Sequence, residues 1–529
     1  MQTTTLRCQK EYRTVKITTM SNYQDSQEEN SQNDLFDQDI TDTPLALPRA
    51  PTAAGCNNTT TNCDCCAKNT ALLQEISEGL SNLAMMAEYE NHLLRLGLSS
   101  NIKLKTKQVE VLKLLEAKNL EILAILPTGY GKSLIYQLAP LILDGTVVVF
   151  SPLSVIQEEQ IQKLRTSGLK CCILNTRSRL MLPSYQQGRI LTADTDEDVK
   201  DLKCDIDIAE VSNCSLIFAH PEAFFCTSEG KDLLDSFSFT SSVQAIVIDE
   251  CHKVVDWGKS FRKAFQHMRE LPGFFPGVPR LGLSATITTK DEADVIASLG
   301  MTNPAVVRAS PDRENIYLQI KVKEPSLDIY DCYENLYKPI CNDLLKNPDI
   351  FPVTLFFMPL QYIGNAATYC NFIFERPTLD TCLYGILCSG QDDEVKNHVI
   401  KELSCEKPKI KLVFCTSVVG MGFNSPSIER VIHARPPRSL SDYIQEIGRA
   451  GRTGKDSTAL LHYCNRDVAA NVKDIKDDII GFCKEKGCLR EYILKQYGFQ
   501  KSEIDLHQCC NNCRPHCLCI ECQMLRIDI

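Results

Sequence analysis

The chain has 529 residues, of which 43% are hydrophobic, and a formal net charge of −10. Its length exceeds that of one ordinary compact domain, so we expect two or three domains. The acidic balance excludes a broadly basic nucleic-acid binder, because phosphate contacts would have to come from local clusters of Lys and Arg.

The cysteine content and the first residues bear on the compartment. The chain contains 27 cysteines, but it is large, and Met1 is followed by the polar run Gln2–Thr5 in place of an apolar signal core. Both features favour a reducing, intracellular setting over a disulfide-rich secreted one. The sequence holds no uninterrupted apolar stretch of the roughly 18 to 20 residues that a membrane span requires, so we expect a soluble protein.

Two segments precede the first predicted domain. Residues 1–69 are rich in Ser, Thr, Asn, Gln and Asp and are interrupted by prolines, which predicts a disordered tail with no core of its own. Residues 70–98 are predicted to form an amphipathic helix. This helix either packs on the next domain or forms a short coiled coil, and the tail or the helix could bind a protein partner. The apolar residues at helical spacing are Leu72, Leu73, Ile76, Leu80, Leu83, Met86, Leu93 and Leu94.

Short apolar runs, each followed by a small or charged cluster, recur after about residue 99 with spacers long enough for a helix. This texture is typical of parallel strands that are buried on both faces and joined by crossover helices. We predict two parallel-sheet α/β domains, residues 99–310 and 311–475, with ligands bound beyond the carboxyl ends of the strands. The predicted strands are Ile122–Leu126, Val147–Phe150, Leu216–Ala219, Ala245–Ile248 and Leu281–Leu283, then Val353–Phe357, Thr381–Tyr384, Lys411–Cys415, Val431–His433 and Ala459–Tyr463.

A phosphate-binding loop is predicted directly after the first of these strands. The run Leu126–Ser133 leads into a predicted helix over residues 133–143, and its first position is Leu where the strict pattern has Gly. Flexible glycines would let successive N–H groups face phosphate oxygens, while a lysine supplies charge and a hydroxyl binds Mg²⁺. The candidate ATP-binding residues are Thr128, Gly129, Gly131, Lys132 and Ser133.

A pair of acidic residues follows the strand Ala245–Ile248. Asp249 and Glu250 are expected to hold Mg²⁺ and to orient the attacking water, respectively. The next predicted strand ends in Ser284-Ala285-Thr286. This order, about 115 residues after a phosphate loop, indicates a nucleoside triphosphatase.

The residues that follow the acidic pair resemble those of superfamily 2 helicases, and specifically of the RecQ family. Lys253–Arg262 resembles the family's aromatic-rich loop, which senses single-stranded DNA, and it contains the only tryptophan of the chain. Ser151-Pro152-Leu153 is similar to the first DNA-contacting motif, and Pro311–Ile316 to the segment that joins the two motor domains. The resemblance covers about residues 100–517 and implies two RecA-like domains. The candidate nucleic-acid contacts are Ser151, Pro152, Trp257, Phe261, Arg262 and Thr416.

The second domain carries two further family motifs. Thr416–Asn424 resembles the motif that touches both the strand backbone and the nucleotide, with Gly422 and Asn424 on the nucleotide side. The run Tyr443–Arg452 resembles the arginine motif, and two arginines three apart on one helical face could reach a triphosphate held by the first domain. Arg452 is expected to be the arginine finger, Arg449 a second phosphate contact and Gln445 a coupling residue. Gly448 and Gly451 are expected to be points of close backbone approach.

One upstream motif departs from the family pattern. Gln108, in the run Leu104–Gln108, is placed to bind the adenine edge, but Lys105 stands where the family has arginine. The stacking aromatic is not evident near Asn101. Lysine lacks the planar guanidinium face, so the base selectivity is left open.

The C-terminal cysteines resemble the RecQ zinc-binding module, which we place at residues 476–522. A closed site of four ligands is the structural kind. Cys488, Cys510 and Cys513 are the expected ligands together with Cys517, although His516, Cys509, Cys519 and Cys522 compete for the fourth position. The upstream group Cys56, Cys63, Cys65 and Cys66 is expected to be free thiols.

The resemblance implies an ATP-dependent 3′–5′ DNA helicase that uses ATP, Mg²⁺ and Zn²⁺, acts on single-stranded and forked DNA, and works in the nucleus. The chain ends soon after Cys522, so we expect a short form without winged-helix or further helical accessory domains. Three alternatives remain open: a translocase that remodels DNA without unwinding it, an RNA helicase, and a zinc-stabilised nucleic-acid scaffold with a decayed motor.

Overall fold

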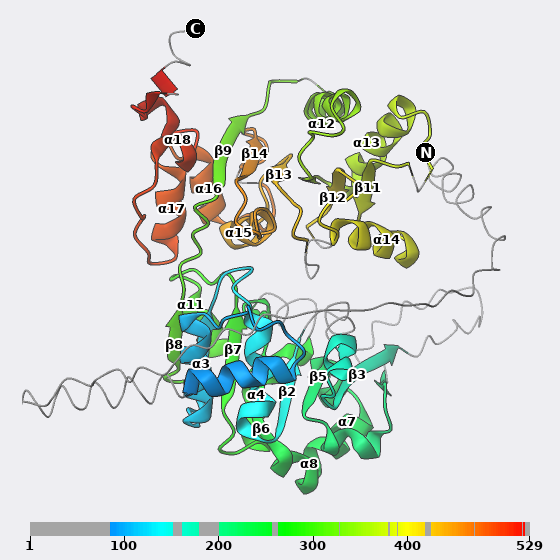
Figure 1. Ribbon diagram of the computed structural model, residues 1–529, viewed down its shortest axis with the longest axis vertical. Helices are drawn as coiled ribbons and strands as arrows, with labels where there is room; N and C mark the ends of the chain where they lie inside the picture. The colour runs from blue at the N-terminus through cyan, green and yellow to red at the C-terminus, as the bar shows by residue number, and fades with distance from the viewer. Residues whose placement is uncertain are drawn as a thin grey trace, which may run out of the picture. The chain divides into compact units, whose positions relative to one another are not determined.

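The structure is a computed structural model that describes residues 85–151, 161–178, 200–255, 263–326, 328–378, 381–388, 390–417, 425–469, 471–520 and 522–523. These residues form an eight-stranded and a six-stranded sheet, each accompanied by helices (Figure 1). The predicted α/β fold with two tandem parallel-sheet domains is therefore confirmed. The predicted tail at residues 1–69 and the helix residues before 85 lie outside the described residues.

The first sheet has the strand order β4-β3-β5-β2-β6-β7-β1-β8. Its neighbouring strands are parallel except for β3 and β4, which pair antiparallel. The strands are β1 Glu121–Ile125, β2 Thr146–Phe150, β3 Cys171–Ser178, β4 Lys200–Cys204, β5 Leu216–Ala219, β6 Val243–Ile248, β7 Arg280–Ser284 and β8 Ala305–Arg308. Its helices are α3 Thr106–Glu116, α4 Lys132–Leu143, α6 Pro221–Phe225, α7 Ser228–Asp235, α8 Phe237–Ser242, α10 Leu271–Phe274 and α11 Glu292–Ser298, with 3₁₀ helices at Ile208–Asn213 and Lys263–Glu270.

Both faces of this sheet are buried, as the alternating side chains of β1 illustrate. Ile122 and Ala124 pack into one apolar cluster, while Leu123 and Ile125 pack into the cluster on the opposite face. Successive side chains of a strand point to opposite faces, so a strand covered on both sides needs apolar residues at every position. The continuous apolar runs in the sequence are the direct result.

The second sheet has the strand order β11-β12-β10-β13-β14-β9, and all of its neighbouring pairs are parallel. Its strands are β9 Ile316–Val322, β10 Thr354–Phe357, β11 Tyr384–Leu387, β12 Leu412–Cys415, β13 Arg430–His433 and β14 Ser457–Tyr463. The helices are α12 Ile329–Lys346, α13 Leu360–Ile373, α14 Asp393–Leu403 and α15 Leu440–Ile447. The C-terminal part adds α16 Asp477–Lys484, α17 Leu489–Gln496, α18 Leu506–Cys509 and a 3₁₀ helix at Arg514–His516.

One predicted strand is displaced. Thr381–Tyr384 was expected, but β11 begins at Tyr384 and runs to Leu387, in register with β12 from Leu412 to Cys415. The register explains the shift, because only Tyr384–Leu387 can continue the sheet beside β12. The apolar run Tyr384-Gly385-Ile386-Leu387 contains a glycine, which weakens the strand signal in the sequence.

The predicted amphipathic helix is helical over residues 85–95, within the described part. Tyr89, Leu93 and Leu96 are buried in the core of the first domain, which favours the packed helix over the coiled coil. The predicted apolar face of this helix was partly wrong, since Leu94 is 54% exposed and Met86 is 39% exposed. The buried face instead follows the i, i+4, i+7 spacing that starts at Tyr89.

The C-terminal part borders the second sheet at its β9 edge. Cys510 forms a parallel bridge with Leu318, and the N–H of Asn511 donates to the Leu318 carbonyl (2.9 Å). The Asn511 side chain accepts from the N–H of Ile320 (3.2 Å) and donates to its carbonyl (3.1 Å). The segment around Cys510 and Asn511, which we call the knuckle, thus satisfies backbone groups that an edge strand would leave unpaired.

Among the residues that the structure describes, none of the helices combines the length and apolar character needed to cross a bilayer.

Candidate nucleotide and metal sites

The predicted phosphate loop lies between β1 and α4. The N–H of Leu126 donates to the carbonyl of Ser284 (2.8 Å), which ties the start of the loop to the end of β7. Gly129 and Gly131 have φ values of 79° and 87°, and α4 begins at Lys132 directly after them. The loop therefore presents the amino end of a helix, where N–H groups favour an anion.

Gln108 and Lys105 support this loop from the start of α3. The Gln108 amide donates to the Gly131 carbonyl (2.9 Å) and accepts from the N–H of Lys105 (2.7 Å). The Gly131 position favours glycine because its φ is 87°, and a Cβ there would also lie 2.6 Å from Gln108 Nε2. Lys105 Nζ donates to the Gly129 carbonyl (3.2 Å) and lies 4.6 Å from the centre of the Tyr130 ring. The Gln108 amide thus contacts the loop in this structure, and its role in reading adenine stays a prediction.

The acidic pair follows β6 at the same edge of the sheet. Asp249 is only 8% exposed, and its burial, with the neighbouring charge of Glu250, raises its pKa to about 7, although Lys132 acts in the opposite direction. Glu250 has a φ of 49°, and its N–H donates to Asp249 Oδ1 (3.0 Å). A non-glycine residue in the left-handed region is strained, and such residues concentrate at functional sites.

His252 connects the acidic pair to the end of β7. Its Nδ1 lies 2.9 Å from Ser284 Oγ and 3.4 Å from Glu250 Oε2. Burial, followed by the charge of Lys253, holds the pKa of His252 well below its ordinary value, so the ring is neutral at physiological pH. Ser284 Oγ also accepts from the N–H of Thr286 (3.2 Å). The Ser-Ala-Thr segment and the acidic pair are thus one hydrogen-bonded unit.

The amino end of α15, in the second domain, contacts this unit. Lys253 Nζ lies 3.3 Å from Asp442 Oδ1, and the hydroxyl of Ser441 donates to the Thr286 carbonyl (2.9 Å). Gln445, the expected coupling residue, is buried on α15. The two domains are therefore joined through the loops that carry the acidic pair.

The arginine motif follows α15. The expectation that Arg449 and Arg452 share a helical face is wrong, because α15 ends at Ile447 and both arginines lie in the turns after it. Gly451, with a φ of 61°, lies in these turns and favours the departure from helical geometry. The arginines are positioned by the turns and by packing instead.

The arginine segment packs against the phosphate loop. A Cβ on Gly448 would lie 3.1 Å from Thr128 Cβ, which confirms close backbone approach at this glycine. Arg313, from the linker between the domains, donates to the carbonyls of Gly451 (2.6 Å) and Ala450 (3.1 Å). The phosphate loop, the linker and the arginine segment therefore meet at one place.

The pKa values of the two arginines of this segment, Arg449 and Arg452, are lowered. Burial lowers the pKa of Arg449, while Glu446, Cys415 and Glu250 act against this, so the carboxylate of the first domain lies within electrostatic reach of Arg449. Burial, and then the charges of Arg449 and Arg313, lower the pKa of Arg452 to about 10. An anion with several charges would stabilise Arg452, which is buried beside two other guanidinium groups.

The donor atoms here suit the groups that a triphosphatase requires. Ser133 and Asp249 provide hydroxyl and carboxylate oxygens, the ligands that Mg²⁺ prefers, and the raised pKa of Asp249 is a feature that a bound cation would reverse. The buried Thr128 Oγ1 has no hydrogen-bond partner among the described residues. These residues therefore fit a magnesium-bound nucleotide.

The candidate nucleic-acid contacts are only partly described. Ser151 is buried after β2, and its N–H donates to the Ala219 carbonyl (3.2 Å). Thr416 follows β12, and its buried Oγ1 finds no hydrogen-bond partner within the described part of the chain. The other predicted contacts, Pro152, Trp257, Phe261 and Arg262, lie outside the described residues, as do the predicted nucleotide-binding residues Gly422 and Asn424.

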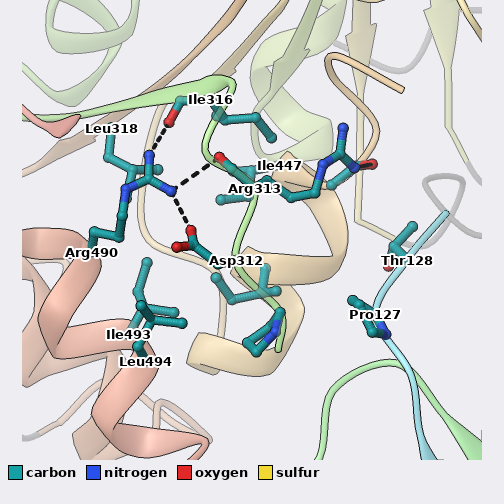
Figure 2. Close-up of a pocket in the computed structure, with 13 residues that line it drawn as sticks. Pro127, Thr128, Asp312, Arg313, Ile316, Leu318, Ile447, Arg490, Ile493 and Leu494 are labelled. Carbon is teal, nitrogen blue, oxygen red and sulfur yellow. Dashed lines mark hydrogen bonds and ion pairs between the residues drawn. The ribbon is translucent and has the colours of Figure 1, made fainter. Parts of the chain in front are cut away.

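A second set of contacts joins the linker to the C-terminal part. Arg490, 3% exposed on α17, forms an ion pair with Asp312 and donates to the carbonyls of Arg313 (3.0 Å) and Ile316 (2.6 Å), as Figure 2 shows. We call these groups the Arg490 junction. It borders a cavity of about 30 Å³ that Pro127 and Thr128 of the phosphate loop also line. Sequence reasoning assigned no role to Arg313 or Arg490, although each lies within a segment singled out for its resemblance.

The C-terminal cysteines form a compact group. Cys488, Cys509, Cys510 and Cys513 each offer a sulfur, and the four sulfurs lie within 4.8 Å of one another. Cys488 caps α17, where its sulfur accepts from the N–H of Glu491 (3.5 Å), and lies 3.5 Å from the Cys509 sulfur. Four thiolates at this separation fit a closed tetrahedral zinc site. Cys509, and not the expected Cys517, provides the fourth sulfur of this group, and Cys517 lies with His507, Cys519 and Cys522.

Two family comparisons match the two sheet domains. The DEAD/DEAH box helicase family matches residues 105–295, and the helicase conserved C-terminal domain matches residues 365–454. The chain is 28% identical over 422 residues to the mouse bifunctional 3′-5′ exonuclease/ATP-dependent helicase WRN, covering 74% of this chain and 27% of that protein. It is 28% identical over 356 residues to the Xenopus laevis RecQ-like DNA helicase BLM, covering 65% of this chain and 23% of that protein. The chain thus spans about a quarter of the length of these curated relatives.

The fold has solved counterparts. The Mycobacterium smegmatis helicase Lhr, bound to ssDNA and AMP-PNP, aligns with a TM-score of 0.51 and 18% identity, covering 76% of this chain and 49% of that chain. An identity this low supports a shared fold alone. Together, the tandem RecA-like sheets, the two helicase domain matches and the similarity to WRN and BLM support a RecQ-like superfamily 2 helicase.

Proposed function

We propose that this protein is an ATP-dependent DNA helicase that moves 3′ to 5′ on single-stranded DNA and separates strands. The observation that carries the proposal is the charge arrangement between the domains. Arg449 lies within electrostatic reach of Glu250, and Gly448 packs against Thr128 of the phosphate loop. A triphosphate held by one domain would therefore meet cations from the other, which is the arrangement that phosphoryl transfer requires.

The proposed division of labour follows from these contacts. Lys132 and the N–H groups after Gly129 bind the β- and γ-phosphates, and Glu250 orients the attacking water. Arg452 and Arg449 stabilise the charge that develops on the γ-phosphate. Ser133 and Asp249 would hold Mg²⁺, which when bound neutralises charge on the phosphate oxygens. Gly422 and Asn424 are proposed on the nucleotide side of the second domain, and Gln108 at the base.

Coupling to nucleic acid is proposed through the contacts around α15. Lys253 pairs with Asp442 and begins the segment that leads to Trp257, Phe261 and Arg262, which we propose to contact single-stranded DNA. Gln445 lies buried on the same helix. Ser151, Pro152 and Thr416 are proposed as further contacts with the strand. DNA as the substrate is supported by the names of the relatives WRN and BLM, and nuclear localisation is part of the same proposal.

A structural zinc ion is proposed for the group Cys488, Cys509, Cys510 and Cys513. The four sulfurs leave no coordination position open for a substrate, so this ion would stabilise the fold. It would join the start of α17 to the knuckle that borders β9.

The test measures ATP turnover by the purified chain without polymer and with single-stranded DNA, duplex DNA or RNA. Single-stranded DNA should increase turnover at least about 10-fold, and Lys132→Ala should abolish the increase by removing charge stabilisation at the phosphates. Lys103→Ala is the matched control, because Lys103 is exposed and, among the described residues, forms an ion pair with Glu90 on the surface. Partial duplexes with a 3′ or a 5′ tail then test strand separation and polarity.

Each alternative gives a distinct result. Robust DNA-stimulated turnover without strand displacement would indicate a remodelling translocase, and equal stimulation by RNA would indicate an RNA helicase. Absence of turnover with every polymer, together with an unchanged Lys132→Ala variant, would reject the motor and leave the nucleic-acid scaffold.

A further inference from the structure

A second group of metal-binding side chains lies next to the first in the C-terminal part. His507, Cys517, Cys519 and Cys522 each offer one ligand atom, and all four atoms lie within 4.8 Å of one another. The Cys517 sulfur lies 3.6 Å from His507 Nδ1. The group shares no residue with the first, so it is a separate candidate site.

Apolar burial does not explain this group. Cys517 and Cys522 are each 5% exposed, whereas the apolar residues between them, Leu518 and Ile520, are 77% and 71% exposed. A segment that folded to hide apolar surface would bury Leu and Ile first, because burying such a side chain is worth about 1.5–3 kcal/mol. Here the thiols turn inward and the larger apolar side chains turn outward. An interaction specific to sulfur must therefore favour this conformation.

The ligand set is that of zinc. Three thiolates and one imidazole make a closed tetrahedral site, and zinc–sulfur bonds of about 2.3 Å would separate the sulfurs by about 3.8 Å. The observed limit of 4.8 Å requires only a small closure of the ligands. A disulfide could use only two of the three thiols, and it would leave the imidazole without a role.

The second group lies beside α18 and near the edge strand β9. The short helix α18 carries His507 toward this group and Cys509 toward the first one, so one turn of helix serves both. Arg514 lies between the two groups in sequence, with its guanidinium 6.0 Å from the centre of the Tyr317 ring on β9. The second group is thus connected to the edge of the second sheet.

We propose that the chain binds a second zinc ion through His507, Cys517, Cys519 and Cys522. This ion is structural, since the protein fills all four positions. It fixes Cys517, Cys519 and Cys522 against α18. The proposal is independent of ATP hydrolysis and of the identity of the nucleic acid.

The experiment counts zinc in the full chain, purified under reducing conditions and without chelator, by elemental mass spectrometry. Wild type should contain about two zinc ions per chain, and Cys519→Ser/Cys522→Ser about one, because each closed site binds one ion. Cys488→Ser/Cys513→Ser should lower the count by the same amount through the other site. Cys405→Ser is the control, because Cys405 is an exposed free thiol outside both groups.

Cobalt substitution keeps the test independent of how well a variant folds. Wild-type protein loaded with Co²⁺ should show overlapping tetrahedral spectra from an S₄ and an S₃N site, and Cys519→Ser/Cys522→Ser should lose only the S₃N component. A wild-type count of about one zinc ion that the Cys519→Ser/Cys522→Ser variant retains would overturn the proposal. Iron in place of zinc, or a Cys517–Cys522 disulfide found under these reducing conditions, would overturn it as well.

Discussion

Two regions of the interdomain junction differ in how their charges are satisfied. At the phosphate loop, Asp249 lies beside Glu250, and burial together with the like charges of Arg449 and Arg313 lowers the pKa of Arg452. At the Arg490 junction, one buried guanidinium has a carboxylate and two carbonyls as partners. We conclude that the phosphate-loop region is suited to bind a charged ligand, whereas the Arg490 junction holds the linker. The two regions lie on either side of the same small cavity.

The largest expected effect is on ATP hydrolysis, through the arginines near the phosphate loop. Arg452→Ala should lower kcat for ATP hydrolysis by about 10³-fold or more, because an arginine at the transferred phosphoryl group contributes on that scale. The melting temperature should change little, since the charges of Arg449 and Arg313 oppose the burial of a third cation at this place. Arg438→Ala is the control, because its side chain is 74% exposed. Near wild-type turnover in Arg452→Ala would remove the arginine finger from the proposal.

The Arg490 junction should behave in the opposite way. Arg490→Met should lower the free energy of unfolding by about 3–5 kcal/mol, because it leaves the buried carboxylate of Asp312 without its partner. Denaturant unfolding measures this loss. The double variant Arg490→Met/Asp312→Leu should recover part of it, since both charged partners are then gone. If Arg490→Met were as stable as wild type, the Arg490 junction would not stabilise the fold, and its contrast with the phosphate-loop region would be wrong.

The smallest effect is a dependence on pH at the acidic pair. The pKa of Asp249 is raised from its ordinary 3.8 to about 7, so the folded chain retains a proton that the unfolded chain releases. Its contribution to stability is present below the lower pKa and is lost as pH rises toward the higher one. At pH 8 without Mg²⁺, Asp249→Asn should be more stable than wild type by at least about 1.4 kcal/mol, the equivalent of one pKa unit.

This gain should shrink toward pH 5, where the wild-type carboxyl is protonated in the folded state. Added Mg²⁺ should also reduce the gain at pH 8, because a cation favours the carboxylate. Denaturant unfolding at the two pH values measures both effects. A gain that is equal at pH 5 and pH 8 would mean that Asp249 ionises normally.

The fold was predictable where burial on both faces leaves an unbroken apolar run, as at Leu216–Ala219, which is β5 as predicted. It was less predictable where pairing decides the limits, as at β11, whose register with β12 cannot be read from composition. The helix at residues 85–95 shows the same limit, because Tyr89 and Leu94 are both apolar but only packing decides which one is buried.

The candidate site was predictable as far as residue type and local order define it. The phosphate loop, the acidic pair and the arginine segment come together, but the contacts that hold the arginine segment include Arg313, which lies in the linker. The fourth sulfur was not predictable, because Cys509 and Cys510 are adjacent and both lie in the group, whereas Cys517 lies with His507. Arg490 was missed because its partners come from the linker, far away in sequence.

The border between the knuckle and β9 has a consequence for handling the protein. Asn511 pairs with the backbone of Leu318 and Ile320 as a short extra strand would. If chelation loosened the knuckle, β9 would become a bare sheet edge able to pair with another copy of itself. We therefore expect metal-stripped preparations to be lost as self-associated material before any unfolded monomer accumulates.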